Sequence, residues 1–222
     1  MTIESYIDYT NLKPDATPND IIQLCKEAKQ YRFASVCVNS SYVPLARREL
    51  AGSYVRIVSV VGFPLGAVAS SIKAAETTFA IANGADEIDM VINIGWVRMG
   101  QYDKVLAEIN ALKEACGDHI LKVIIETCLL TDEEKIKMCE TVAASGADFI
   151  KTSTGFSAAG ATKPDVALMK AHMTAGKKIK AAGGIADFND AREFVLLGAD
   201  RLGTSRLVEQ AKKKGGDLDA EI

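Results

Sequence analysis

Short apolar runs alternate with longer stretches of helical periodicity along almost the whole chain. The apolar runs are hydrophobic on both faces, a pattern typical of strands that are buried in a parallel sheet. They lie at 6–12, 33–39, 55–63, 85–93, 120–127, 147–153, 178–184 and 199–205. Helical stretches follow them at 16–32, 41–50, 67–84, 102–116, 131–146, 164–175, 187–198 and at the end of the chain. The pattern therefore predicts eight strands, each followed by a helix.

Local signals support this division of the chain. Thr17 before Pro18 predicts an N-cap followed by the first turn of a helix, and Thr131 with Glu134 predicts a capping box. The triplet Gly-Ala-Asp recurs at 84–86, 146–148 and 198–200. In each copy the glycine is expected to end a helix in the left-handed conformation, and the next residues begin a strand. The copies lie about two βα units apart, which would place them at strands 4, 6 and 8.

Eight βα units in 222 residues predict an α/β fold, a single-domain (β/α)8 TIM barrel that occupies residues 1–222. There is no linker and no break in composition, so a second domain is not expected. An open, doubly wound sheet is the alternative architecture. The motif G-x-G-x-x-G, which is typical of dinucleotide-binding members of that class, does not follow the first strand.

Composition and charge exclude several classes of partner. The net charge is -3 and no long basic block is present, so we expect no nucleic-acid partner; the run Lys212–Lys214 fits a solvated helix end. No apolar run approaches the roughly 18 residues of a membrane helix, and the N-terminus does not resemble a signal peptide. Five cysteines without a C-x-x-C motif suit reduced thiols in a cytoplasmic protein, and His119 and His172 lie too far apart to suggest a zinc site.

Three ionisable residues interrupt the apolar runs near their carboxyl ends, where barrels of this class build their active sites. They are Asp89, Lys151 and Lys180. Each charge alone would fit a structural salt bridge or an outward-pointing side chain, because a charge inside a barrel is costly. Two lysines on adjacent strands suggest more, since a neighbouring ammonium group and desolvation lower the pKa of an amine and free it as a Schiff-base nucleophile. The residues alone do not decide which lysine is the nucleophile.

Glycines and hydroxyl residues follow the last three predicted strands. Such loops bind phosphate in barrels, because glycines let backbone N–H groups approach the anion. The pattern predicts a site for a small phosphosugar in the loops 152–157, 183–186 and 203–205. Its expected ligands are Thr152, Gly155, Gly183, Gly184, Gly203 and Ser205.

Eight segments across the chain resemble, in the same order, the class I deoxyribose-phosphate aldolase family. They include "IDYTNLKPDAT" (7–17), "GADEIDMVINIG" (84–95), "GADFIKTSTGF" (146–156) and "IKAAGGI" (179–185). The resemblance implies reversible cleavage of 2-deoxy-D-ribose 5-phosphate to D-glyceraldehyde 3-phosphate and acetaldehyde, in deoxyribonucleotide catabolism. It assigns the Schiff base to Lys151, the perturbing cation to Lys180 and proton relay to Asp89. It also implies no metal and no organic cofactor, and a homodimer or another homo-oligomer.

Other residues receive more modest expectations. Tyr9, Asn11, Ser40 and Trp96 depart from the family pattern and are expected to affect substrate contacts or subunit packing. Near the strand ends we expect sugar contacts from Asp8, Asn39 and Thr127, a charged barrel neighbour in Lys122, a core position for Cys37 and a surface position for Lys13.

Two other functions fit the same residues. A transaldolase-like enzyme or another Schiff-base barrel would accept ketose donors. A non-catalytic phosphosugar-binding barrel would bind the substrate without cleaving it.

Overall fold

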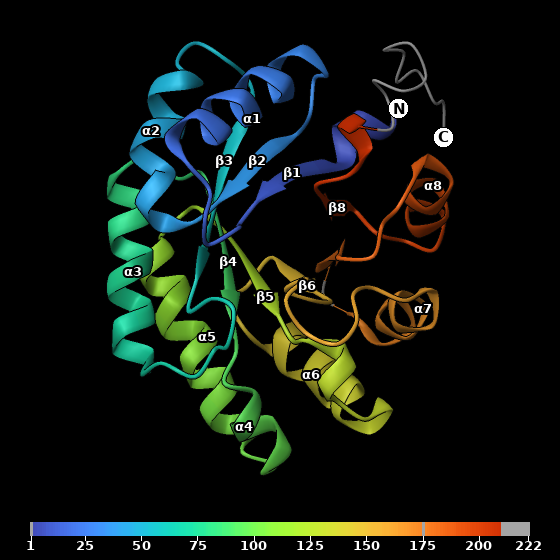
Figure 1. Cartoon of the computed structure of the whole chain (residues 1–222). Coiled ribbons are helices and arrows are strands. Elements are labelled where there is room, and N and C mark those ends of the chain that lie inside the picture. The colour runs from blue at the N-terminus through green and yellow to red at the C-terminus, as the bar shows by residue number, and fades with distance from the viewer. Residues whose placement is uncertain (1, 175, 210–222) are drawn as a thin grey trace.

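Eight parallel strands close into a barrel in the computed structural model, which describes residues 2–174 and 176–209 (Figure 1). The strands are β1 (Ile7–Asn11), β2 (Ser35–Val38), β3 (Arg56–Val61), β4 (Glu87–Val91), β5 (Ile120–Ile124), β6 (Phe149–Lys151), β7 (Lys178–Ala182) and β8 (Arg201–Thr204). Each strand pairs with the next along the chain, and β1 pairs with β8 to close the ring. The predicted TIM barrel is confirmed, and the open doubly wound sheet is wrong.

Helices surround this barrel on its outside. They are α1 (Pro18–Gln30), α2 (Val43–Glu49), α3 (Ser70–Ala82), α4 (Ile94–Arg98), α5 (Tyr102–Cys116), α6 (Asp132–Ala144), α7 (Lys163–His172) and α8 (Phe188–Leu196). Three short 3-10 helices accompany them: η1 (Ile3–Tyr6), η2 (Ser40–Tyr42) and η3 (Thr127–Leu129). The short α4 was not predicted. The predicted last helix begins at 207 and is described only to 209, and Lys212–Lys214 lie outside the described residues. None of the described helices is long and apolar enough to span a membrane.

The predicted caps are present at both helix starts. Thr17 and Asp20 form a capping box at α1, and Thr131 and Glu134 form one at α6. All three Gly-Ala-Asp triplets precede strands, namely β4, β6 and β8. The conformational prediction holds for Gly84 and Gly198, whose φ angles are 104° and 107°. It is wrong for the glycine of 146–148, which has no positive φ because the preceding serine already ends α6 in an extended conformation.

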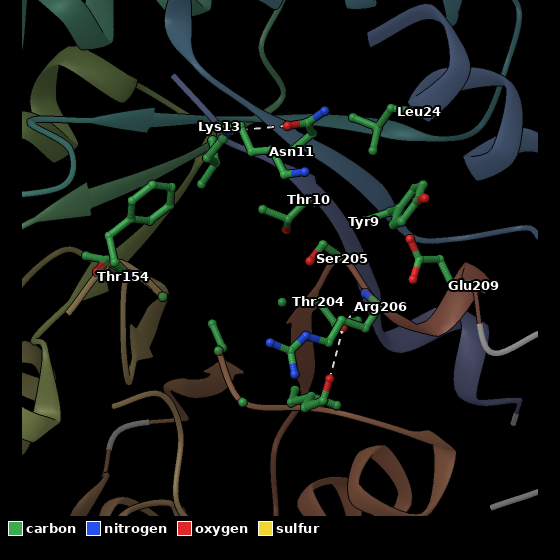
Figure 2. A pocket seen from close by; sticks show the side chains of 18 of the residues that line it. Tyr9, Thr10, Asn11, Lys13, Leu24, Thr154, Thr204, Ser205, Arg206 and Glu209 are labelled. Carbon is green, nitrogen blue, oxygen red and sulfur yellow. Dashed lines mark hydrogen bonds between the residues drawn. The ribbon is translucent and has the colours of Figure 1, made fainter. Parts of the chain in front are cut away.

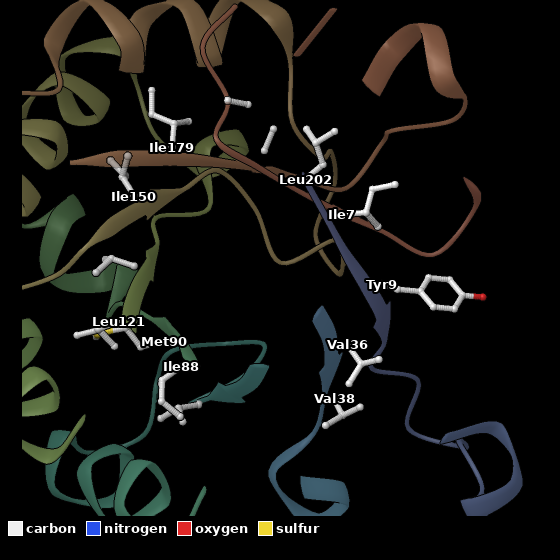
Figure 3. Close-up of a cluster of buried hydrophobic side chains, with 14 of the residues drawn as sticks. Ile7, Tyr9, Val36, Val38, Ile88, Met90, Leu121, Ile150, Ile179 and Leu202 are labelled. Atoms are coloured by element: carbon white, nitrogen blue, oxygen red, sulfur yellow. The ribbon is translucent and has the colours of Figure 1, made fainter. Parts of the chain in front are cut away.

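Apolar and charged side chains alternate along the strands between the two faces of the barrel wall. The outward-facing apolar side chains pack under the helices and form the main hydrophobic core (Figure 3). Ile88 and Met90 flank Asp89, Ile150 precedes Lys151, and Ile179 precedes Lys180. This alternation leaves the charged residues of the same strands inside the barrel.

Candidate active site

A cluster of charged side chains fills the barrel interior. Every member is at most 8% exposed, and charged residues this buried are normally paired. The cluster consists of Asp8, Glu87, Asp89, Lys122, Lys151, Lys180 and Arg201.

Lys151 and Lys180 converge on a single carboxylate oxygen. The register of β6 and β7 places the two residues side by side. The Nζ atoms of Lys151 and Lys180 donate hydrogen bonds of 2.7 and 2.8 Å to Oδ2 of Asp89. Because both nitrogens contact one oxygen, they cannot be farther apart than about twice that distance. The structure thus brings together the three predicted residues, and an outward-pointing side chain is excluded for all of them; their catalytic roles remain predictions.

Six of the seven charges form a closed ring, which we call the interior charge ring. Lys180 contacts Asp8 and Asp89, and Lys122 lies 2.9 Å from Asp89 and 2.5 Å from Glu87. Arg201 closes the ring through Nη2 at 3.0 Å from Glu87 and Nε at 2.7 Å from Asp8. Three carboxylates therefore alternate with three cations. Within the described part of the chain, Lys151 is joined to the ring through Asp89 alone.

Asp89 and Lys180 hold their charges despite burial. Burial opposes the charge of Asp89, but Lys122, Lys151 and Lys180 outweigh it and hold the pKa of the carboxyl well below its usual range. Burial likewise opposes the charge of Lys180, but the carboxylates of Asp8 and Asp89 outweigh it and raise its pKa. The Lys180 nitrogen is therefore a stable cation at neutral pH.

Lys151 behaves differently from its neighbour. Burial lowers the pKa of its amine, and the Lys180 ammonium lowers it further. The Asp89 carboxylate opposes both effects, but the pKa still lies below the usual value of a lysine. The ring gives the physical reason, because its three carboxylates already have three cations of their own. A proton on Lys151 would be an excess buried charge. The geometry thus favours Lys151 as the neutral amine, a choice that the residues alone left open.

A cavity of about 600 Å³ opens above Lys151 at the carboxyl ends of the strands. Lys151 lines it, whereas Asp89 and Lys180 lie below its floor. Figure 2 shows part of the wall, which combines residues at and after the carboxyl ends of β1, β6, β7 and β8 with residues of α1 such as Leu24. A substrate in this cavity would therefore reach the Lys151 nitrogen but not the carboxylate beneath it.

Five of the six predicted phosphate ligands line this cavity, namely Gly155, Gly183, Gly184, Gly203 and Ser205. The exception is Thr152, whose hydroxyl accepts a hydrogen bond from the backbone N–H of Ala182 at 3.1 Å. It also donates one to the Ala182 carbonyl at 3.3 Å and is fully buried. The prediction that Thr152 lines the phosphate site is wrong, because its side chain instead ties β6 to β7.

Backbone packing explains why the loop after β7 needs glycine. Gly183 and Gly184 both have φ of 77°, in the left-handed region. A Cβ atom added to Gly160 would lie 2.3 Å from the carbonyl carbon of Gly183. The adjacent Ala161 N–H donates to the carbonyls of Ala182 and Gly183, both at 3.0 Å. The segment after β6 thus presses directly on the glycine loop and fixes its position.

The sequence reading missed two cationic residues of the wall. Arg206 and Lys13 both line the cavity, and Figure 2 shows the Arg206 side chain extending across it from the end of β8. Among the described residues, the guanidinium of Arg206 has no ion pair. Lys13 was predicted only as a surface residue. Arg206 directly follows the "GTS" loop, but this position alone does not distinguish it from an ordinary surface charge.

An aromatic pair lies beside the cavity. Phe63 and Phe156 meet edge to face with ring centroids 5.2 Å apart, and Phe156 lines the cavity. Phe63 packs on a small apolar cluster inside the barrel that includes Cys37. Burial raises the pKa of the Cys37 thiol, so the thiol is neutral. This agrees with the predicted core position of Cys37.

The departures from the family pattern have local partners away from Lys151. Tyr9 donates to Oε2 of Glu27 at 2.7 Å across the interface with α1. Ser40 donates to Oε1 of Glu76 at 2.8 Å, and Trp96 lies under the Lys104 ammonium at 5.9 Å. None of the three touches the interior charge ring.

The remaining polar predictions have mixed outcomes. Asn11 accepts from the Lys13 backbone at 3.3 Å, and like Tyr9 it lines the edge of the cavity. Asp8 belongs to the ring rather than to the wall. Asn39 and Thr127 do not line the cavity, so the expectation that they contact a sugar is not supported by its geometry.

Comparison with known proteins identifies the chain's relatives. A family model described as DeoC/LacD family aldolase matches residues 3–203. A deoxyribose-phosphate aldolase of Streptococcus mutans is 52% identical over 205 residues, which cover 92% of this chain and 93% of the relative. One of Clostridium tetani is 51% identical over 216 residues, 96% of this chain and 100% of the relative. The solved deoxyribose phosphate aldolase of Aeropyrum pernix, described as tetrameric, superimposes with a TM-score of 0.85 at 31% identity and covers 95% of this chain and 91% of its own.

Proposed function

The chain belongs to the DeoC/LacD family of aldolases, and from this premise we propose that it is a class I deoxyribose-phosphate aldolase. It cleaves 2-deoxy-D-ribose 5-phosphate to D-glyceraldehyde 3-phosphate and acetaldehyde, and it catalyses the reverse condensation. The observation that carries the proposal is the buried Lys151 amine at the floor of a cavity whose wall suits a phosphate, where burial and the Lys180 ammonium lower the pKa of that amine. A site that only bound a phosphosugar would not need a neutral amine.

Lys151 supplies the covalent chemistry. Its amine attacks the aldehyde carbon of the substrate, and loss of water gives an iminium ion on the lysine nitrogen. The iminium accepts the electrons of the C2–C3 bond as that bond breaks, while the C3 hydroxyl loses its proton. Glyceraldehyde 3-phosphate leaves, and the enamine that remains takes a proton at carbon. Hydrolysis of the new iminium then releases acetaldehyde and restores the amine.

Asp89 and Lys180 support these steps from below the cavity. Asp89 holds the Lys151 nitrogen at 2.7 Å, so its carboxylate faces the positive charge that develops when the iminium forms. Lys180 keeps Asp89 ionised and shares the same oxygen. Together with water, the two residues relay protons to and from the reacting nitrogen.

The phosphate group occupies the opposite wall of the cavity. The backbone N–H of Gly184 in the loop after β7 and the hydroxyl of Ser205 after β8 approach its oxygens. Arg206, which has no ion pair among the described residues, supplies the cationic partner. Binding energy from this remote group orients the aldehyde carbon toward Lys151.

Replacing Arg206 with glutamine is expected to lower kcat/KM for deoxyribose 5-phosphate by about ten- to a hundredfold, mostly through KM. A charge-assisted hydrogen bond contributes roughly 1.5–3 kcal/mol, and this one forms with the phosphate in both the ground state and the transition state. Steady-state kinetics with unphosphorylated deoxyribose provide the control, because that substrate cannot use the guanidinium. An equal loss with both substrates would show that Arg206 does not recognise the phosphate.

The proposed activity is tested by a coupled assay for glyceraldehyde 3-phosphate released from deoxyribose 5-phosphate, with chelator present. The expected result is turnover that needs no added metal. Binding of deoxyribose 5-phosphate without release of product would favour the non-catalytic barrel. Turnover with ketose donors in place of acetaldehyde would favour a transaldolase-like enzyme.

We also propose a homo-oligomer that acts in deoxyribonucleotide catabolism in the cytoplasm. The tetrameric Aeropyrum pernix structure supports the assembly, and the described cysteines are all free thiols, which suits a reducing compartment. Size-exclusion chromatography with light scattering tests the assembly, and a monomeric mass would contradict it.

A further inference from the structure

The lower half of the interior charge ring does not reach the substrate cavity. It consists of Glu87, Lys122 and Arg201, and none of the three lines the wall. Glu87 and Lys122 are fully buried, and Arg201 is 8% exposed. The proposed chemistry gives them no direct task. Burying them is nevertheless costly, which raises the question of what they do.

Lys151 is surrounded by ionisable groups from most of the barrel strands. Asp89 touches its nitrogen, and Cys37 and Lys180 are its other charged or titratable neighbours in the interior. Cys37 is neutral. The other buried charged groups of the barrel interior are Asp8, Glu87, Lys122 and Arg201, and Glu126 is buried in the loop after β5.

The charges of the ring cancel only when the lower half is complete. Lys122 bridges the Asp89 and Glu87 carboxylates, and Arg201 bridges those of Glu87 and Asp8. Removal of one lower anion leaves the ring with a net positive charge. Removal of one lower cation leaves it with a net negative charge. Asp89 transmits either imbalance directly to the Lys151 nitrogen, because it belongs to the ring and bonds that nitrogen.

We propose that Glu87, Lys122 and Arg201 are positioning residues that determine the charge of the Lys151 amine through the balance of this ring. The proposal rests on the proposed function, in which the amine is the nucleophile. The proposal predicts opposite directions for the shift of the Lys151 pKa in two variants. Loss of Glu87 makes the amine easier to deprotonate, whereas loss of Lys122 makes it harder, although both substitutions damage the same ion pair.

The test is a titration of the Lys151 amine in the variants Glu87→Gln and Lys122→Met. Labelling with acetic anhydride over a pH series, read by mass spectrometry of the Lys151 peptide, reports the neutral amine whether or not the enzyme turns over. We expect the apparent pKa to move by on the order of one pH unit, downward in Glu87→Gln and upward in Lys122→Met. The acidic limb of kcat/KM against pH should move in the same directions.

Two further variants distinguish an effect of the net charge of the ring from an effect of disrupting any ion pair of Glu87. Arg56→Gln removes a guanidinium that also lies 3.1 Å from Glu87 but is 55% exposed, so solvent screens it and the titration should not change. The double variant Glu87→Gln with Lys122→Met restores neutrality and should titrate like the parent protein. If a single variant does not fold, the double variant still tests this expectation.

Several outcomes would overturn the proposal. They are single variants that shift in the same direction or not at all, an Arg56→Gln shift as large as that of Glu87→Gln, and a double variant that fails to return to the parent value. Failure of the proposed function is a different result, namely absence of turnover in the parent protein while the labelling titration still proceeds.

Discussion

Lys151→Met is expected to lower kcat/KM for deoxyribose 5-phosphate by at least about 10⁴-fold, because the substitution removes the only proposed nucleophile. The fold should survive. Among the described residues of the interior cluster, Lys151 is the member outside the charge ring, so its loss leaves three carboxylates with three cations. We therefore expect a midpoint of thermal unfolding equal to or above that of the parent protein. The coupled assay and a thermal melt of the same preparation measure both quantities.

The combination of lost activity and retained stability is the specific prediction. Residual activity within about tenfold of the parent would mean that another group attacks the aldehyde. A strongly lowered melting temperature would mean that the buried ammonium of Lys151 pairs with Asp89 as a structural cation. Either result would contradict the assignment of a neutral amine.

Lys180→Leu is expected to lower kcat/KM by about 10³-fold and, unlike the change at Lys151, to destabilise the protein by about 3–5 kcal/mol. Asp8 and Asp89 lose their shared cation, and two buried carboxylates remain with too few partners. The deficit draws a proton onto Lys151, so its pKa rises and the nucleophile is lost at neutral pH. Urea denaturation measures the free energy of unfolding, and the pH dependence of kcat/KM measures the shift.

Lys180→Arg is the matched control for this substitution. It keeps a cation between the two carboxylates, and it should recover most of the stability and a measurable part of the activity. If the arginine variant were as inactive and as unstable as the leucine variant, the charge of residue 180 would not be what matters.

The barrel was predictable from the sequence because its strands are buried on both faces and therefore read as nearly continuous apolar runs. Charged residues near the ends of these apolar runs are unusual, and Asp89, Lys151 and Lys180 were identified for this reason. The ring itself was not predictable. Its closing contact joins Asp8 to Arg201, which lie 193 residues apart, and no local pattern indicates which charges share a partner. The same limit explains why the residues alone did not distinguish Lys151 from Lys180.

The phosphate wall was predicted only in part. Gly183 and Gly184 both adopt a positive φ angle. A glycine-rich loop in the sequence indicates such a backbone, so these two positions were predictable. Thr152 was placed on the wall because it is a hydroxyl residue in the segment that follows a predicted strand, but its side chain instead bonds the backbone of Ala182. Arg206 was missed because a basic residue after a last strand resembles an ordinary surface charge, and only the three-dimensional path of its side chain shows where it points.

The most direct measurement is reduction of the protein with borohydride in the presence of acetaldehyde, followed by mass spectrometry of its peptides. If the Lys151 nitrogen is the uncharged nucleophile, one lysine gains the mass of an ethyl group, and that lysine is Lys151. An unmodified Lys151, or an ethyl group on Lys180 instead, would contradict the account at its centre.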